Sequence, residues 1–203
     1  MIIYDCEIKK VIPDFPINEM PPQYEYCRGW KDFEGMGCSV VGTYDYIEQR
    51  YRIFCDDNLQ EFQELVNQRD LVIGFNNHQF DDPLMEACGV TIPKEKSWDI
   101  LAEIWHAAGL AREFCSDDHK LFGLDACCRA NFNTGKTGNG RMAPIDWQEG
   151  NIGTVIDYCL SDVALTKRLV DQIAIDRHIL DPRDPSHRLW IMDSQFHAIC
   201  MAD

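Results

Sequence analysis

The sequence predicts an α/β domain, in which a mixed β-sheet carries helices on its faces. Strand-like apolar runs dominate the first third of the chain, including two that are separated only by a short turn. Farther on, strand-like and helix-like segments alternate, which is typical of a sheet covered by helices. The 203 residues, of which 45% are hydrophobic and 26% charged, suit one globular domain with a substantial core.

The N-terminal part supplies the antiparallel strands. Residues 1–8, MIIYDCEI, read as a strand that begins almost at the first residue. Residues 35–46 and 50–55 predict two further strands joined by a short turn. Between the first strand and the second lies a stretch with four prolines, which we expect to be a loop.

Helices and one buried strand follow. Residues 56–68 begin with cap-type residues and then carry apolar side chains at helical spacing, which predicts a helix. The compact apolar run at 70–76 predicts a strand that ends at a Gly-Phe-Asn corner. Further helices are expected at 82–89, 97–109, 120–132 and roughly 149–175. We therefore place the domain at residues 1–176 and assign no structure to the tail at 177–203, which DPRDPSHR interrupts.

The net charge and the distribution of the acids limit the kinds of ligand that the protein can bind. The net charge of −15 argues against a protein that coats nucleic acid with basic side chains. A polyanion would have to be met by a local patch, and the acid-free stretch between Asp125 and Asp146 offers one with Arg129, Lys136 and Arg141. The alternative for this Gly-rich stretch is a solvated loop without a ligand.

The lack of recognisable targeting signals and the irregular spacing of the cysteines lead us to expect a soluble, cytoplasmic protein. No apolar run approaches the roughly 18 residues of a membrane span. No basic segment followed by an apolar one marks a secretory signal at the N-terminus. The ten cysteines are irregularly spaced and contain no C-x-x-C pair, so we expect reduced thiols rather than disulfides or a zinc site.

Two acids share one face of the first strand. Asp5 and Glu7 are two residues apart, and side chains at that spacing project from the same side of a strand. An otherwise apolar strand has no reason to bury two acids together unless something neutralises them. Asp32 and Glu34 repeat the D-x-E pattern without a strand around them, so we interpret that copy as a solvated loop.

Further acids lie at two predicted helices. Asp81 follows the corner at Asn76 and precedes Pro83, where an aspartate either caps the helix or leans toward Asp5. Tyr158 and Asp162 are one turn apart and share a helix face, a pairing that is also common on wet helix surfaces. If they converge, four such acids can hold two Mg²⁺ ions about 4 Å apart, which is the arrangement that hydrolyses phosphodiesters.

These residues form three ordered motifs. D-x-E at Asp5, N-x-x-x-F-D-x-P from Asn76 through Phe80 and Asp81, and Y-x-x-x-D at Tyr158 resemble the exonuclease motifs of the DEDD superfamily. The chain is similar to the tyrosine-bearing (DEDDy) branch and, within it, to the proofreading domain of family B DNA polymerases. The resemblance covers about residues 1–175 and implies a ribonuclease H-like fold. It also implies 3′→5′ removal of nucleotides with Mg²⁺ or Mn²⁺.

The resemblance also assigns roles. It implies that Asp5, Glu7 and Asp162 hold one metal ion, that Asp5 and Asp81 hold the second, and that Tyr158 positions the attacking water. The expected substrate is the 3′ end of single-stranded or frayed DNA, with RNA as the alternative. Candidate substrate contacts are Asn76, Phe80, Arg129, Lys136 and Arg141. Four loop aromatics could also stack on bases, although we favour a buried or half-buried role for them: Tyr24, Tyr26, Trp30 and Phe33.

Two other functions compete with this hypothesis. The first is a non-catalytic relative that keeps the fold and binds nucleic acid or protein. The second is an NTPase, because ANFNTGKT (130–137) resembles a phosphate-binding loop that would use Lys136. Such a loop needs a strand before it and a helix after it. Here a predicted helix precedes it, and we expect that the following GNGRMAP cannot start a helix.

Overall fold

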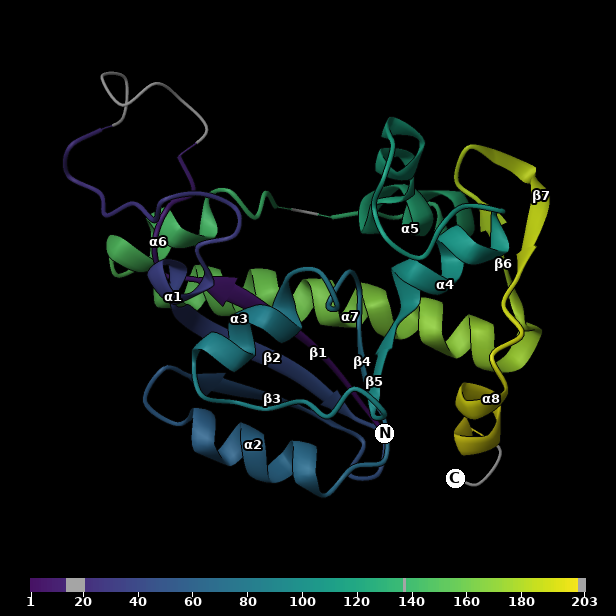
Figure 1. The fold of residues 1–203 in the computed structure, drawn as a ribbon, viewed down its shortest axis with the longest axis horizontal. Coiled ribbons are helices and arrows are strands. Elements are labelled where there is room, and N and C mark those ends of the chain that lie inside the picture. The colour runs from purple at the N-terminus through teal and green to yellow at the C-terminus, as the bar shows by residue number, and fades with distance from the viewer. Residues whose placement is uncertain (14–20, 137, 201–203) are drawn as a thin grey trace.

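A computed structural model of the chain describes residues 1–13, 21–136 and 138–200. Its centre is a mixed five-stranded sheet with the strand order β3-β2-β1-β4-β5, flanked by helices (Figure 1). β1 pairs antiparallel with β2 and parallel with β4. The strands of this sheet are β1 (Ile2–Ile8), β2 (Cys38–Asp45), β3 (Arg50–Cys55), β4 (Val72–Gly74) and β5 (Ser97–Asp99). This architecture confirms the predicted α/β class and is compatible with a ribonuclease H-like fold.

The helices are distributed on both faces of the sheet, and the long α7 runs across it (Figure 1). Those before the acid-free stretch are α1 (Phe33–Met36), α2 (Leu59–Asn67), α3 (Asp81–Ala87), α4 (Ile100–Ala107), the 3₁₀ helix η2 (Asp117–Phe122) and α5 (Leu124–Phe132). Those within and after it are α6 (Ala143–Gln148), α7 (Ile152–Asp176) and α8 (Ser194–Cys200).

Two predicted helices are each divided. The segment predicted as one helix over 97–109 begins as β5 and becomes helical only at Ile100. Asp99 decides this, because its carboxylate accepts hydrogen bonds from the backbone N–H groups of Leu101 and Ala102 and so caps α4. The segment at 120–132 is split at Gly123, whose extended backbone separates η2 from α5.

The segment after α7 folds onto the domain. It forms a hairpin of β6 (His178–Asp181) and β7 (Asp184–Trp190), followed by α8. Ile179, Leu189 and Phe196 are buried in the same apolar cluster as the α7 side chains. Phe196 also stacks on Trp98 at 4.3 Å between ring centroids. We assigned no structure to this segment because DPRDPSHR interrupts its pattern, and the partners of its apolar residues lie far away in the chain.

The alternation of β1 decides which way the first two acids point. Ile2, Tyr4, Cys6 and Ile8 pack into the apolar cluster that includes residues of α2 and α3. Ile3 belongs to the cluster on the opposite face, which includes residues of α7. Successive strand side chains point to opposite faces, so Asp5 and Glu7 follow Ile3 and face α7.

Two further expectations concern cysteines and membranes. Cys127 and Cys128 are both buried free thiols, and no disulfide joins these neighbours. No helix in the described part of the chain combines the length and the hydropathy that a membrane span requires.

Candidate active site

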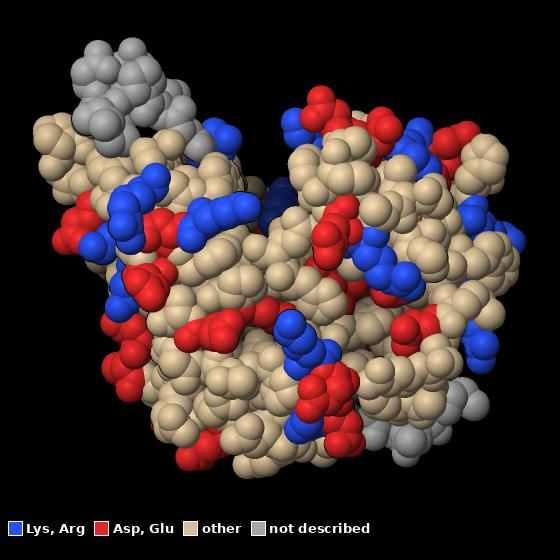
Figure 2. Space-filling view, in the orientation of Figure 1, with Lys and Arg blue, Asp and Glu red and all other residues tan. Residues whose placement is uncertain are grey.

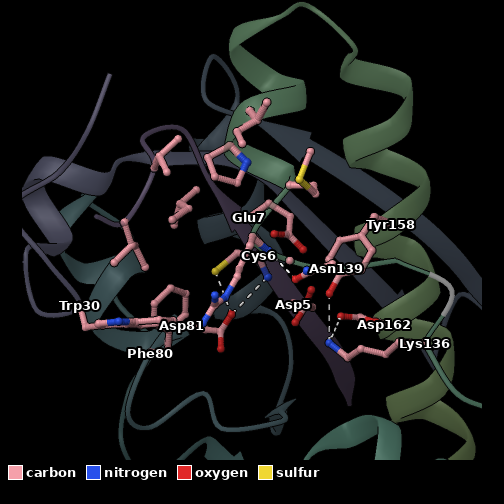
Figure 3. A pocket seen from close by; sticks show the side chains of 18 of the residues that line it. Asp5, Cys6, Glu7, Trp30, Phe80, Asp81, Lys136, Asn139, Tyr158 and Asp162 are labelled. Atoms are coloured by element: carbon pink, nitrogen blue, oxygen red, sulfur yellow. Dashed lines mark hydrogen bonds and ion pairs between the residues drawn. The ribbon is translucent and has the colours of Figure 1, made fainter. Parts of the chain in front are cut away.

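A cavity of about 630 Å³ opens at the C-terminal ends of β1 and β4. Figure 3 shows that acidic side chains from the strand and from two helices point into it. All five residues predicted as catalytic line this cavity, together with side chains of segment 21–30 and of the Gly-rich stretch. The five are Asp5, Glu7, Asp81, Tyr158 and Asp162.

The cavity exists because β4 is short. β4 pairs with β1 only at Ile2 and Ile3, and the chain then turns at Asn76, which has a φ of 71°. Asparagine tolerates this left-handed conformation better than most residues. The edge of β1 beyond Ile3 is therefore not covered by β4.

Asp81 fills part of this uncovered edge. Its Oδ1 accepts hydrogen bonds from the backbone N–H of Cys6 at 3.2 Å and from the Cys6 thiol at 2.9 Å. The carboxylate is thereby fixed to β1 between Asp5 and Glu7. Neither Asp81 nor Asp82 caps α3, since Asp82 instead accepts hydrogen bonds from Tyr4, Asn77 and Ser97. No sequence pattern indicated the contact with Cys6, because it involves a backbone N–H group.

Asp5 and Glu7 face Cys159 of α7. Their carboxylate oxygens and the Cys159 sulfur lie within 4.8 Å of one another. The Cys159 thiol also donates to the backbone carbonyl of Asp5 at 3.4 Å. One helical turn brings Tyr158 and Asp162 to the same cavity.

Gly42 allows this close approach of α7. It lies opposite Asp5 on β2, and a Cβ atom there would meet the Cys159 sulfur at 2.8 Å and Val163 Cγ2 at 3.3 Å. Both neighbours are fully buried, so neither can move aside freely. The lack of a side chain at Gly42 therefore sets the distance between α7 and the acids of β1.

We expect Gly42→Ala to lower the free energy of unfolding by about 1–3 kcal/mol, because it overpacks this contact. Gly153→Ala in the first turn of α7 is the matched control. A Cβ there meets nothing within 4 Å, so alanine should be neutral or stabilising. Urea unfolding measures both variants, and equal stability of the two would contradict the packing argument.

Lys136 lies between the two functional residues of α7. Its ammonium donates to the Tyr158 hydroxyl at 3.2 Å and forms an ion pair with Asp162 Oδ2. The Gly-rich stretch reaches the Tyr158 ring closely, since a Cβ on Gly138 would lie 2.6 Å from it. The other carboxylate oxygen of Asp162 is buried and has no hydrogen-bond partner among the described residues. A buried carboxylate oxygen left in this state needs a cation or a donor.

Burial raises the pKa of three of these acids, and nearby carboxylates add to the rise. Burial raises the pKa of Asp5 well above its ordinary value, and the carboxylates of Asp81 and Asp162 add to the rise. Burial likewise raises the pKa of Glu7, and the negative charge of Asp5 raises it further. For Asp81, burial raises the pKa to about 7, while the hydrogen bond from the Cys6 thiol opposes the rise. The cluster therefore holds negative charge only at a cost that a bound cation would remove.

Four of the five residues predicted to contact substrate line the cavity. Asn76, Phe80, Lys136 and Arg141 line the cavity. Arg129 does not: it is an exposed residue of α5 whose Nε donates to Asp125 at 2.7 Å. The ion pair with Asp125, one helical turn earlier, holds its guanidinium outside the cavity lining. Figure 2 shows acidic and basic side chains interspersed on the face in view rather than one extended positive region.

The alternative phosphate-binding loop lacks its strand. Residues 130–132 are the end of helix α5 and residues 133–136 follow that helix rather than a strand, while Thr137 lies outside the described residues. The prediction that no helix could start after this loop was wrong, because α6 begins at Ala143. Pro144 lies in its first turn, where the missing N–H has no partner to lose. In a phosphate-binding loop the lysine would reach the phosphates, whereas here the Lys136 ammonium contacts Asp162 and Tyr158.

Comparison with known proteins identifies the fold. No protein-family model matches the sequence, and no curated protein matches it. A solved structure of the family B DNA polymerase from the hyperthermophilic archaeon Pyrobaculum calidifontis is similar, with a TM-score of 0.52 and 14% sequence identity. The similarity covers 85% of this chain and 24% of the polymerase, so this chain spans about a quarter of that protein's length. The structural similarity shows a shared fold, and at this sequence identity it shows the fold alone.

Proposed function

We propose that this chain is a metal-dependent 3′→5′ exonuclease of the DEDDy type that acts on single-stranded or frayed DNA ends. The observation that carries the proposal is the convergence of four acids and a tyrosine in one cavity: Asp5, Glu7, Asp81, Asp162 and Tyr158. The similarity in fold to a family B DNA polymerase supports it. The order of the three motifs along the chain supports it independently.

The side chains present fit divalent cations. Carboxylate oxygens are the ligands that Mg²⁺ and Mn²⁺ prefer, and the unpartnered oxygen of Asp162 is available as one of them. We propose that Asp5, Glu7 and Asp162 hold one cation and that Asp5 and Asp81 hold the other. Bound cations would supply activation of the attacking water and stabilisation of the leaving 3′ oxygen.

Tyr158 is suited to orienting a water or a phosphate oxygen. Burial raises the pKa of its phenol above the ordinary value, so the hydroxyl stays protonated near neutral pH and can donate. Lys136 already donates to the phenol oxygen, which leaves the phenol proton free to point into the cavity. Lys136 and Arg141, both lining the cavity, provide the local positive charge that a polyanion needs on this acidic chain.

Digestion of end-labelled oligonucleotides tests the proposal. With Mg²⁺ or Mn²⁺, a 3′ label should leave as a mononucleotide, while a 5′ label should pass through a ladder of shortening products. EDTA should stop both reactions. A parallel series with RNA decides the sugar preference. Oligonucleotides that are bound but never cut would favour the non-catalytic relative, and cleavage of circular single strands would contradict an exonuclease.

We expect Tyr158→Phe to slow cleavage by about 10- to 100-fold, because the acids remain while the orienting hydroxyl is lost. The KM should change little. Tyr46→Phe is the matched control, since it also removes a phenol hydrogen bond, to Asp171 at 2.7 Å, away from the cavity. Single-turnover kinetics compares the two, and a parental rate in Tyr158→Phe would remove this residue from the mechanism.

A further inference from the structure

Trp30 places a large exposed ring at the cavity. The residue lines the cavity, and 57% of its surface is accessible. Its indole meets the Phe80 ring edge to face, with the centroids 6.4 Å apart. Figure 3 shows Trp30 and Phe80 together on the side of the cavity opposite Tyr158 and Asp162. Trp30 lies farther from the acids than Phe80, which directly precedes Asp81.

Several hydrogen bonds stabilise the turn that contains Trp30. The Asp32 carboxylate accepts hydrogen bonds from the Arg28 backbone N–H at 2.7 Å and from its guanidinium at 2.9 Å. The Asp32 N–H donates to the Gly29 carbonyl at 3.0 Å and closes the turn around Trp30. Buried Cys27 and Met36 anchor the chain on either side. The backbone of the turn is therefore held in place, while the indole stays open to solvent.

The neighbouring aromatics differ from Trp30 in this respect. Tyr24 and Tyr26 are half-buried, and their hydroxyls bond to Glu149 and to the Pro21 carbonyl. Phe33 is half-buried against Phe80. The expectation that the loop aromatics are buried or half-buried thus holds for these three, whereas Trp30 keeps most of its surface accessible.

We propose that Trp30 stacks on the penultimate base of a single-stranded 3′ end, an inference that rests on the proposed function. A strand whose last phosphodiester lies at the acids has its terminal base nearest Phe80 and the preceding base one ring farther out. Stacking on an aromatic ring tolerates any base, since each base has a π-face. It also requires that base to be unpaired. Trp30 would therefore select single-stranded or frayed ends without reading sequence.

Binding in EDTA tests this contact without cleavage. Fluorescence anisotropy of a short 5′-labelled single strand should show about tenfold weaker binding by Trp30→Ala. Trp190→Ala is the matched control, because Trp190 is 54% exposed and contacts His178 on the C-terminal hairpin rather than the cavity. Its affinity should equal the parental value. Equal affinities of all three proteins would overturn the proposal.

Abasic oligonucleotides locate the contact. Removing the penultimate base should weaken binding by the parental protein about tenfold. The same change should leave binding by Trp30→Ala almost unchanged. Removing a base near the 5′ end should affect both proteins equally. Coupling at the terminal base, or at no position, would overturn the assignment.

A substrate without a penultimate base separates this inference from the proposed function. Thymidine 5′-(p-nitrophenyl phosphate) should be hydrolysed by Trp30→Ala at the parental rate, although oligonucleotide KM rises. Loss of this hydrolysis too would mean that Trp30 maintains the cavity and would overturn the base contact. A parental protein that cleaves no substrate would refute the exonuclease function, while anisotropy with abasic strands would still decide the role of Trp30.

Discussion

Glu7→Gln is expected to abolish cleavage, with a loss of at least about a thousandfold, or ~4 kcal/mol of activation free energy. The substitution keeps the shape of a buried side chain but removes a charge that we propose to hold a cation. Asp5→Asn and Asp81→Asn should have effects of the same size. Release of nucleotides from 3′-labelled single-stranded DNA with Mg²⁺ measures the loss.

The second D-x-E copy provides the matched control. Glu34 is the corresponding acid of that copy, but it lies exposed in α1 and does not line the cavity. Glu34→Gln should therefore cleave at the parental rate. Glu7→Gln should also fold normally and unfold in metal-free buffer with unchanged or higher free energy, because it relieves repulsion among clustered carboxylates. Full activity in Glu7→Gln would refute the proposed metal site.

The metal-free protein is expected to lose stability as the pH rises from about 4 to about 7 and beyond, by a few kcal/mol in total. The folded-state pKa of Asp81 is about 7, and those of Asp5 and Glu7 are also raised. Over this range the folded protein binds more protons than the unfolded chain, so each rise in pH favours unfolding. Urea unfolding in EDTA across the range measures the slope.

The opposite slope is expected in acid. The pKa of Asp45 is lowered, since the hydrogen bonds and charge of Arg69 outweigh the effect of burial. Its stabilisation is present above about pH 4 and is lost as the pH falls further. The metal-free protein should therefore be most stable near about pH 4.

Cation binding should reverse the loss at high pH. Ligand carboxylates must be ionised, so Mg²⁺ or Mn²⁺ should raise the Tm more at about pH 8 than at about pH 5. Glu7→Gln should show a much smaller rise, whereas Glu34→Gln should match the parental protein. A cation-induced rise in Tm that is the same at both pH values, or unchanged in Glu7→Gln, would contradict this assignment.

Features that depend on local geometry could be predicted from the order of the residues alone. Strand alternation placed Asp5 and Glu7 on one face, and helical spacing paired Tyr158 with Asp162, because both patterns are fixed by the backbone of a single element. Local capping was also visible in principle, as the cap at Asp99 shows, although helix-like spacing concealed β5.

Which residues contact one another depends on how the elements pack. The Cys6 backbone holds Asp81, Lys136 reaches Asp162, Arg129 turns away to Asp125, and the C-terminal hairpin joins the core. The exposure of Trp30 depends in the same way on a turn and on a ring from another segment. Each of these contacts joins groups whose separation depends on how several elements pack. Sequence patterns within one element carry no information about that packing.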